Sequence, residues 1–270
     1  MYREFFGLKE KPFNITSDPN FLFMSRVHKE AFSHLVYGIK ERKGFLEITG
    51  EVGAGKTTLC RALISQLDRN TKSAYIFNST LPEAQLLQAI LEDYGIVVTG
   101  RTKVSMLRQL NNFLIDELSR NNNVVLIIDE AQNLSNKILE EIRMLSNLET
   151  DKEKLIQIIL VGQPELKAKL SSPCLKQLRQ RISVRFHITP LDKDEVAEYV
   201  GHRLTVAGSD GRIRFSPDAL EQIYGFSGGV PRLINSVCDK ALLSAYVAET
   251  MEISGALIDK GIREIEGVMA

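Results

Sequence analysis

The sequence lacks an excess of charge, a cysteine framework and a clustered set of histidines. Its 34 basic and 34 acidic residues leave no net charge, so no global attraction to nucleic acid or to an anionic membrane is expected. The three cysteines are too widely separated for a disulfide framework or a zinc cluster. We interpret them as buried apolar residues in a reducing compartment. The four histidines have no metal-ligand spacing and are interpreted as ordinary surface or core residues.

Long hydrophobic runs are also missing. No stretch approaches the ~18 apolar residues of a membrane span, and the N-terminus has no apolar core behind a basic flank. We therefore expect no signal peptide and no membrane segment in this chain, and we place it in the cytoplasm. A cytoplasmic part of a longer protein would have the same composition. No dinucleotide fingerprint and no Ser/His/Asp or Cys/His constellation can be argued from the sequence.

Short β-rich runs alternate with segments of helical periodicity in the first two thirds of the chain. The apolar runs predict strands at residues 45–49, 73–77, 124–128, 155–161 and 183–188. Between them, apolar residues recur at spacings of three and four, which predicts helices that cover the faces of a sheet. The alternation is typical of an α/β fold with a parallel sheet. Residues 124–128 are apolar without alternation, so this strand is expected to be central.

No strand is predicted after Pro190. Helical patterns cover residues 192–207, 216–225, 230–249 and 254–266. Ser216 and Ser254 are helix-start signals, whereas Gly208 and Gly225 are stop signals. We predict an α/β domain at residues 1–190, including an N-terminal arm and first helix at residues 1–44, followed by a small helical domain at residues 191–270.

The N-terminal arm is rich in phenylalanine. Its aromatic residues are Phe5, Phe6, Phe13, Phe21 and Phe23. Such crowding favours an arm that is pinned to the domain by aromatic burial. A share in an adenine pocket is the alternative.

One segment carries the phosphate-binding pattern GxxxxGK[ST]. It consists of Gly50, Glu51, Val52, Gly53, Ala54, Gly55, Lys56 and Thr57, and a helix is predicted from Thr58. The segment lies between a predicted strand and that helix, as the pattern requires. The glycines let successive N–H groups and the helix N-terminus face a polyanion, Lys56 reaches the β- and γ-phosphates, and the Thr57 hydroxyl ligates Mg²⁺. The alternative is a glycine-rich turn without a ligand.

Two carboxylates follow the apolar strand 124–128. Asp129 and Glu130 therefore emerge at the carboxyl edge of the sheet, where ligands bind in open α/β folds. Asp129 is predicted to hold Mg²⁺ through water, and Glu130 to orient and polarise an attacking water molecule. The alternative is that the pair caps the N-terminus of the next helix.

Three further signals are weaker. Gln163 follows the strand 155–161, where its side chain reaches a γ-phosphate or positions water, although Gly162 and Pro164 also suit a plain turn. Arg232, in the run GGVPR, begins a helix and is expected to reach the phosphates. The third signal is a stretch without acidic residues that contains Lys167, Lys169, Lys176, Arg179, Arg181 and Arg185.

An arginine from this basic stretch, if placed on the nucleotide of a neighbouring subunit, implies that the protein assembles into an oligomer. A solvated basic face and a patch that contacts DNA are the alternatives.

These motifs carry a family resemblance. The runs GEVGAGKTT, VVLIIDEAQNL, VGQPEL, LRQRISVRF and GGVPRLIN occur in the order of an AAA+ ATPase. The opening FFGLKEKPFNITSDPNFLFMSRVHKEAF, together with YGIKERKGFLEITGEVGAGKTT, resembles the ExeA/GspA group. That group comprises the ATPases of the general (type II) secretion pathway and of related pilus and exopolysaccharide systems.

The resemblance implies a P-loop fold with a five-stranded parallel sheet, a helical lid, and nucleotide held between them. The residues that it implies for function are Lys56, Thr57, Asp129 and Glu130 for ATP and Mg²⁺, Gln163 as sensor 1, Arg232 as sensor 2, and Arg181, then Arg179, as the arginine that acts in trans. Members commonly continue into a membrane helix and a periplasmic peptidoglycan-binding domain. A sequence that ends at Ala270 is either the cytoplasmic module of such a chain or a short member.

Our leading hypothesis is a cytoplasmic AAA+ ATPase that assembles with nucleotide between its subunits and drives a secretion or pilus assembly apparatus. A DNA-associated ATPase of the transposition or replication-initiation type is the second hypothesis. The basic stretch favours it, whereas overall neutrality and the lack of a helix-turn-helix module oppose it. A small-molecule phosphotransferase is the third, and the pairing of Glu130 with Asp129 argues against it.

Overall fold

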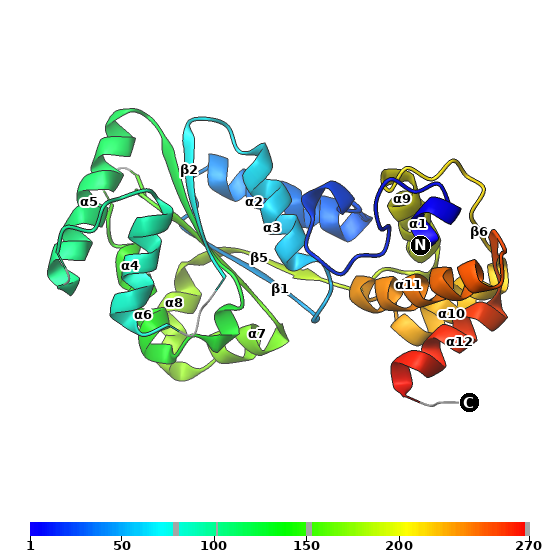
Figure 1. The fold of residues 1–270 in the computed structure, drawn as a ribbon. Helices are drawn as coiled ribbons and strands as arrows, with labels where there is room; N and C mark the ends of the chain where they lie inside the picture. The colour runs from blue at the N-terminus through cyan, green and yellow to red at the C-terminus, as the bar shows by residue number, and fades with distance from the viewer. Residues whose placement is uncertain (78–80, 101, 150–152, 268–270) are drawn as a thin grey trace. The chain divides into compact units, whose positions relative to one another are not determined.

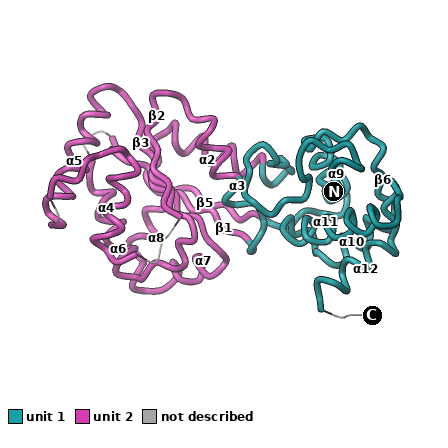
Figure 2. Tube along the Cα trace, viewed as in Figure 1, with its two compact units in different colours: residues 1–28, 51–58, 189–270 teal, residues 29–50, 59–188 magenta. Residues whose placement is uncertain are grey.

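The structure, a computed structural model, describes residues 1–77, 81–100, 102–149 and 153–267. Contacts divide the chain into two compact units (Figure 2). The sheet unit contains residues 29–50 and 59–188, and the helical unit contains residues 1–28, 51–58 and 189–270. The arm and residues 51–58 therefore group with the helices, whereas the sequence pattern predicts them in the domain that contains the sheet. The domain division at residue 190 stays a prediction.

The sheet unit is built on five parallel strands in the order β2-β3-β4-β1-β5. The strands are β1 (Phe45–Gly50), β2 (Thr71–Ile76), β3 (Asn123–Ile128), β4 (Gln157–Gly162) and β5 (Ile182–Ile188). The five predicted strands are thus confirmed, with shifts of a few residues at their ends. The middle position belongs to β4, so the expectation that the strand 124–128 is the central one was wrong by one place. β3 is nevertheless an inner strand, as its continuous burial requires.

Helices follow each strand (Figure 1). Those that lie wholly or mainly in the sheet unit are α2 (Arg26–Lys40), α3 (Lys56–Gln66), α4 (Glu83–Asp93), α5 (Lys103–Ser119), α6 (Asn136–Leu145), α7 (Pro164–Leu170) and α8 (Lys176–Arg181). The first helix after the phosphate-binding pattern begins at Lys56 rather than at the predicted Thr58. The short turns η2 (Ala131–Asn133) and η3 (Pro173–Leu175) are one-turn 3₁₀ helices.

The strand order decides which face each helix covers. The chain leaves β1 for the far edge at β2 and then returns through β3 and β4 to β5. Right-handed crossovers in opposite directions place α3 on one face and α4 to α8 on the other. Gly38 of α2 lies against β1 on the α3 face, because a Cβ atom there would lie 2.2 Å from Leu46.

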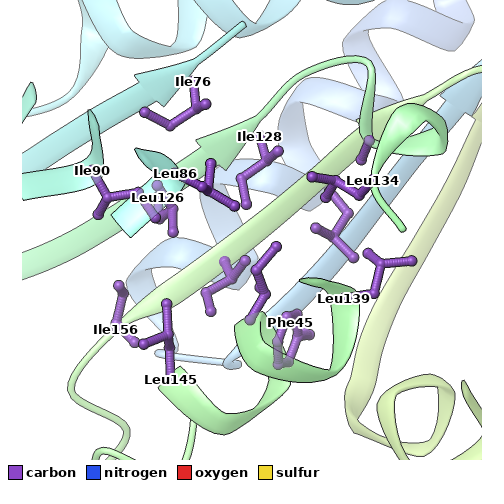
Figure 3. Close-up of a cluster of buried hydrophobic side chains, with 14 of the residues drawn as sticks. Phe45, Ile76, Leu86, Ile90, Leu126, Ile128, Leu134, Leu139, Leu145 and Ile156 are labelled. Carbon is purple, nitrogen blue, oxygen red and sulfur yellow. The ribbon is translucent and has the colours of Figure 1, made fainter. Parts of the chain in front are cut away.

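The main core lies under α4 to α8. Leu126 and Ile128 of β3 share a face with Ile158 and Leu160 of β4, because the parallel register pairs them directly. Leu86 and Ile90 of α4 and Leu139 and Leu145 of α6 close over this surface (Figure 3). The resulting burial, about 25 cal/mol per Å² of apolar surface, fixes the strands whose carboxyl ends carry the polar motifs.

The helical unit confirms the four predicted helices. They are α9 (Lys193–Val206), α10 (Pro217–Ser227), α11 (Pro231–Val247) and α12 (Gly255–Glu266). Gly208 follows α9 with a φ of +85°, as a stop signal should. Gly225 does not stop α10, which continues to Ser227 and ends at the left-handed Gly228. The prediction of no strand after Pro190 was also wrong, since β6 (Arg214–Phe215) and β7 (Glu252–Ile253) form a short parallel pair.

The N-terminal arm packs into this unit. It contains α1 (Tyr2–Phe5) and the 3₁₀ turn η1 (Pro19–Phe21), and its buried aromatic residues are Tyr2, Phe6, Phe13 and Phe21. Arg203 of α9 is buried and donates hydrogen bonds to the carbonyl oxygens of Pro12 and Asn14. Its guanidinium lies 4.4 Å from the centroid of the Phe21 ring. Aromatic burial therefore fixes the arm, as its composition predicts, and the buried Arg203 adds contacts that the composition did not indicate.

Candidate nucleotide-binding site

The phosphate-loop segment follows β1 without a break. Gly53 and Gly55 have φ values of +80° and +91°, a conformation that only glycine adopts without strain. Gly50 is required for a different reason, because a Cβ atom there would lie 2.7 Å from the carbonyl oxygen of Ile188. Lys56 is buried at the start of α3, and its Nζ donates to the Glu51 carbonyl at 2.8 Å. The loop therefore has the turn, the lysine and the helix N-terminus that bind phosphate.

Within the helical unit, the first turn of α11 lies against this loop. The Arg232 N–H donates to the Gly53 carbonyl at 3.3 Å. A Cβ atom on Gly53 would lie 2.4 Å from that of Arg232, so glycine is needed for the close approach as well as for its φ. The Arg232 side chain itself is exposed. The structure thus brings the proposed sensor 2 residue to the phosphate loop. Thr57 and Thr58 are half-buried in the first turn of α3.

A second contact on the loop comes from His28, in the first turn of α2. Its Nε2 lies 3.0 Å from the Ala54 carbonyl oxygen, and its Nδ1 lies 2.8 Å from Ser25 Oγ. From the sequence alone, this histidine is interpreted as an ordinary surface or core residue. No local pattern marks it, because its partner lies 26 residues further along the chain.

The acidic pair lies at the carboxyl end of β3. Asp129 is 2% exposed, and its two carboxylate oxygens accept hydrogen bonds from the Tyr75 hydroxyl at 2.6 Å and from the Glu130 N–H at 2.9 Å. Glu130 has a φ of +51°, which is strained for a residue with a side chain. The next α-helix, α6, is capped by Ser135, and Glu130 makes no side-chain cap. The helix-capping interpretation of the pair is therefore not supported.

Two glutamines converge on Glu130. Gln163, which follows β4, donates from Nε2 to Glu130 Oε2 at 3.0 Å. Gln132 donates from its own Nε2 to the same oxygen and accepts the Gln163 N–H at 3.1 Å through Oε1. The strands β3 and β4 are neighbours, so their carboxyl ends bring the two segments together. The sequence pattern indicates Glu130 and Gln163 but not Gln132, which connects them.

Several cations of the basic stretch have partners inside the sheet unit. Lys169 donates to the carbonyl oxygens of Gln132 and Leu134, so α7 fastens the turn after Glu130. Arg181 donates to Ser146 Oγ at 2.7 Å. These contacts leave fewer cations for a DNA-binding patch.

A further ion pair in the sheet unit joins β5 to β1. Arg185 lies 3.2 Å from the buried Glu47 carboxylate, and burial raises the pKa of Glu47 despite that partner. Arg179, in contrast, is exposed at the end of α8.

The site residues suit a magnesium ion that reaches the protein together with phosphate. A threonine hydroxyl and a carboxylate are hard oxygen donors of the kind that Mg²⁺ prefers, and the helical unit offers Thr57 and the sheet unit Asp129 as such donors. Among the described residues, no group of three or more histidine, cysteine or acidic side chains forms a metal cluster by itself.

Cys60 and Cys238 are buried, but Cys174 is exposed, so the prediction of three buried cysteines was wrong at that position. No helix in the described part of the chain is long and apolar enough to span a membrane.

Comparison with known proteins gives concordant results. Residues 39–170 match the family described as "AAA domain". Over 269 residues, 99% of the chain, the sequence is 44% identical to general secretion pathway protein A of Aeromonas hydrophila. The chain spans 49% of the length of that protein.

Solved structures share the fold. The Aeropyrum pernix ORC2 protein in its ADP form has a TM-score of 0.73, with 95% of this chain and 73% of that one covered. Cdc6p from Pyrobaculum aerophilum has a TM-score of 0.71, with 91% and 70% covered. Both are only 18% identical to this sequence, so they show the fold alone.

The parallel sheet, the phosphate loop after β1 and the acidic pair after β3 define a P-loop fold of the AAA+ class, and residues 39–170 match the AAA domain family. Within that class, it is similar along nearly its whole length to general secretion pathway protein A. The resemblance to the ExeA/GspA group is therefore confirmed.

Proposed function

We propose that the chain binds Mg-ATP at residues 50–58 and hydrolyses it to ADP and phosphate. The observation that carries this proposal is the loop itself. Two glycines with positive φ turn the main chain directly into a helix that begins at Lys56. A helix N-terminus preceded by such a turn presents N–H groups to an anion, and the lysine adds a full positive charge.

The side chains then have separate roles in hydrolysis. Thr57 and Asp129 would hold a magnesium ion, which would neutralise charge on the phosphates. Glu130 accepts a proton from a water molecule as the water oxygen bonds to the γ-phosphorus, and the bond from that phosphorus to the β-γ bridging oxygen breaks. The products are ADP and inorganic phosphate.

The neighbouring polar residues support that step. Gln163 fixes the Glu130 carboxylate by the hydrogen bond at 3.0 Å and responds to the γ-phosphate. Arg232, at the loop, adds positive charge for the phosphates.

The same proposal includes an oligomer in which an arginine of one copy acts on the nucleotide of the next. Arg181 and Arg179 are the candidates. Arg181 is bonded to Ser146 within its own chain, whereas Arg179 is exposed. An arginine that reaches a second copy must be accessible, so these contacts favour Arg179. Loss of such an arginine lowers turnover by ~10³-fold or more, with little effect on the binding of ATP by a single chain.

For the cellular role, we propose the assembly or operation of a secretion- or pilus-type envelope apparatus from its cytoplasmic side. The support is the 44% identity to general secretion pathway protein A over 99% of this chain. About half of that relative lies outside the match, so the proposal does not extend to contacts that the other half makes with the envelope. In cells that lack this protein, the wild type should restore export of a secreted enzyme and Glu130→Gln should not. Restoration of export by Glu130→Gln would show that the cellular role does not require ATP hydrolysis.

The biochemical proposal is tested by phosphate release from ATP in the absence of any added acceptor. Wild-type protein with Mg²⁺ should release phosphate, and Lys56→Ala should neither bind ATP nor release phosphate. Formation of ADP that requires a small-molecule acceptor and yields a phosphorylated acceptor instead of free phosphate would identify a phosphotransferase. Arg179→Ala and Arg181→Ala, measured over a range of protein concentrations, distinguish the two candidates for the arginine in trans.

A further inference from the structure

His28 occupies an unusual place in the helical unit. The residue is 3% exposed, and its ring lies directly on the phosphate loop, because a Cβ atom on Gly55 would come within 3.1 Å of Nε2. Both ring nitrogens have partners, the Ala54 carbonyl at 3.0 Å and Ser25 Oγ at 2.8 Å. A buried imidazole with two satisfied nitrogens is held in one orientation.

The partners decide which nitrogen carries the proton. A carbonyl oxygen only accepts, so Nε2 must donate to Ala54. Nδ1 then has a lone pair, and it accepts the Ser25 hydroxyl proton. Ser25 Oγ in turn accepts the backbone N–H of His28 at 3.3 Å, as a helix N-cap does. Burial lowers the pKa of His28, which keeps the ring in this neutral form at pH 7.

The hydrogen bond to Ala54 also fixes an amide. In a trans peptide, the C=O and the following N–H point in opposite directions. Because the Ala54 carbonyl points to His28, the Gly55 N–H points away from it. The preceding carbonyl, that of Gly53, is held by the N–H of Arg232. Two consecutive carbonyls of the loop thus accept hydrogen bonds from other segments of the helical unit, His28 and Arg232.

We propose that His28 is a positioning residue, which holds the Ala54 carbonyl so that the Gly55 N–H faces the phosphates of bound nucleotide. This inference rests on the proposed function. His28 lies in the same chain segment as the aromatic arm. Five residues before it, Phe23 packs on Tyr199 of α9, with 5.8 Å between the ring centroids. His28 therefore connects the arm to the phosphate loop.

Two amide replacements separate the contacts of the ring. Gln at position 28 places an N–H donor near the position of Nε2, whereas Asn places its amide near the position of Nδ1. His28→Gln should bind Mg-ATP with a dissociation constant within about threefold of the wild type. His28→Asn should bind at least tenfold more weakly, because the loop amide loses its fixed direction. Ser25→Ala should fall between them.

Calorimetric titration of ATP and of ADP into the full chain measures these affinities, and thermal unfolding of each variant controls for folding. Equal affinity of His28→Asn and wild type would overturn the inference. A loss of affinity in both variants that follows their loss of melting temperature would overturn it too, because it would show a purely structural role. Absence of ATP binding by the wild type, with His28 intact, would instead refute the proposed function itself.

Discussion

Replacement of Glu130 by Gln separates catalysis from binding at the carboxyl end of β3. The variant keeps the size and shape of the side chain but cannot accept a proton from water. In the wild type, the amides of Gln132 and Gln163 both donate to Glu130 Oε2. The carbonyl oxygen of the new amide can accept both, so these two hydrogen bonds are kept in the variant.

The magnitudes follow from these contacts. Loss of a general base lowers a rate by about 10²- to 10⁴-fold. At 1.36 kcal/mol for each factor of ten, this is about 2.7–5.4 kcal/mol in the activation free energy. Exchange of a charged acceptor for a neutral one at two hydrogen bonds changes the free energy of unfolding by about 1–2 kcal/mol at most. The effect on turnover should therefore exceed the effect on stability.

Three measurements on the same preparation test this prediction. Steady-state phosphate release should fall at least 100-fold, the dissociation constant for Mg-ATP should stay within about threefold, and the urea midpoint should move little. Lys56→Ala, which should lose binding, is the matched control. A turnover within threefold of the wild type would refute the role of Glu130.

Three further predictions concern the surroundings of the site. Gln132→Met should lower turnover about tenfold with unchanged ATP affinity, since Glu130 loses one donor; a wild-type rate would contradict the role of that bridge. The raised pKa of Glu47 means that the folded state binds its proton more tightly, so stability is lost as the pH rises above about 4.5. Glu47→Gln should therefore gain urea resistance relative to the wild type toward pH 8, and a variant that is weaker there would refute this. Arg203→Met should lower the free energy of unfolding by about 2–4 kcal/mol, because the Pro12 carbonyl loses its donor; a loss under 0.5 kcal/mol would contradict it.

Much of the fold could be predicted from local pattern. Each strand of the sheet is a short apolar run, and each covering helix from α3 to α6 shows apolar residues at spacings of three and four. The phosphate loop is recognisable because its glycines, lysine and threonine are consecutive in the chain. β6 and β7 could not be predicted, because a strand of two residues is too short to show an alternating hydrophobic pattern. α10 passes through Gly225 because its helical hydrogen bonds and burial outweigh the ~1 kcal/mol penalty of one glycine.

The parts of the site that escaped prediction depend on contacts between distant segments. His28 meets Ala54, and Gln132 meets the Gln163 N–H, only after the chain has folded. Neither residue type is unusual for its local sequence. The exposure of Cys174 and the pairing of Arg181 with Ser146 are likewise set by neighbours from other elements. Sequence spacing identifies the candidate phosphate-binding residues, whereas the residues that contact them from distant segments require the structure.

Titration of ATP into the full chain with Mg²⁺ tests the central claim most directly. The account predicts saturable binding with a dissociation constant below about 1 mM for the wild type. It predicts no measurable binding for Lys56→Ala, whose melting temperature should be close to that of the wild type. A wild-type chain that fails to bind ATP at millimolar concentration, or a Lys56→Ala variant that binds it equally well, would contradict the account.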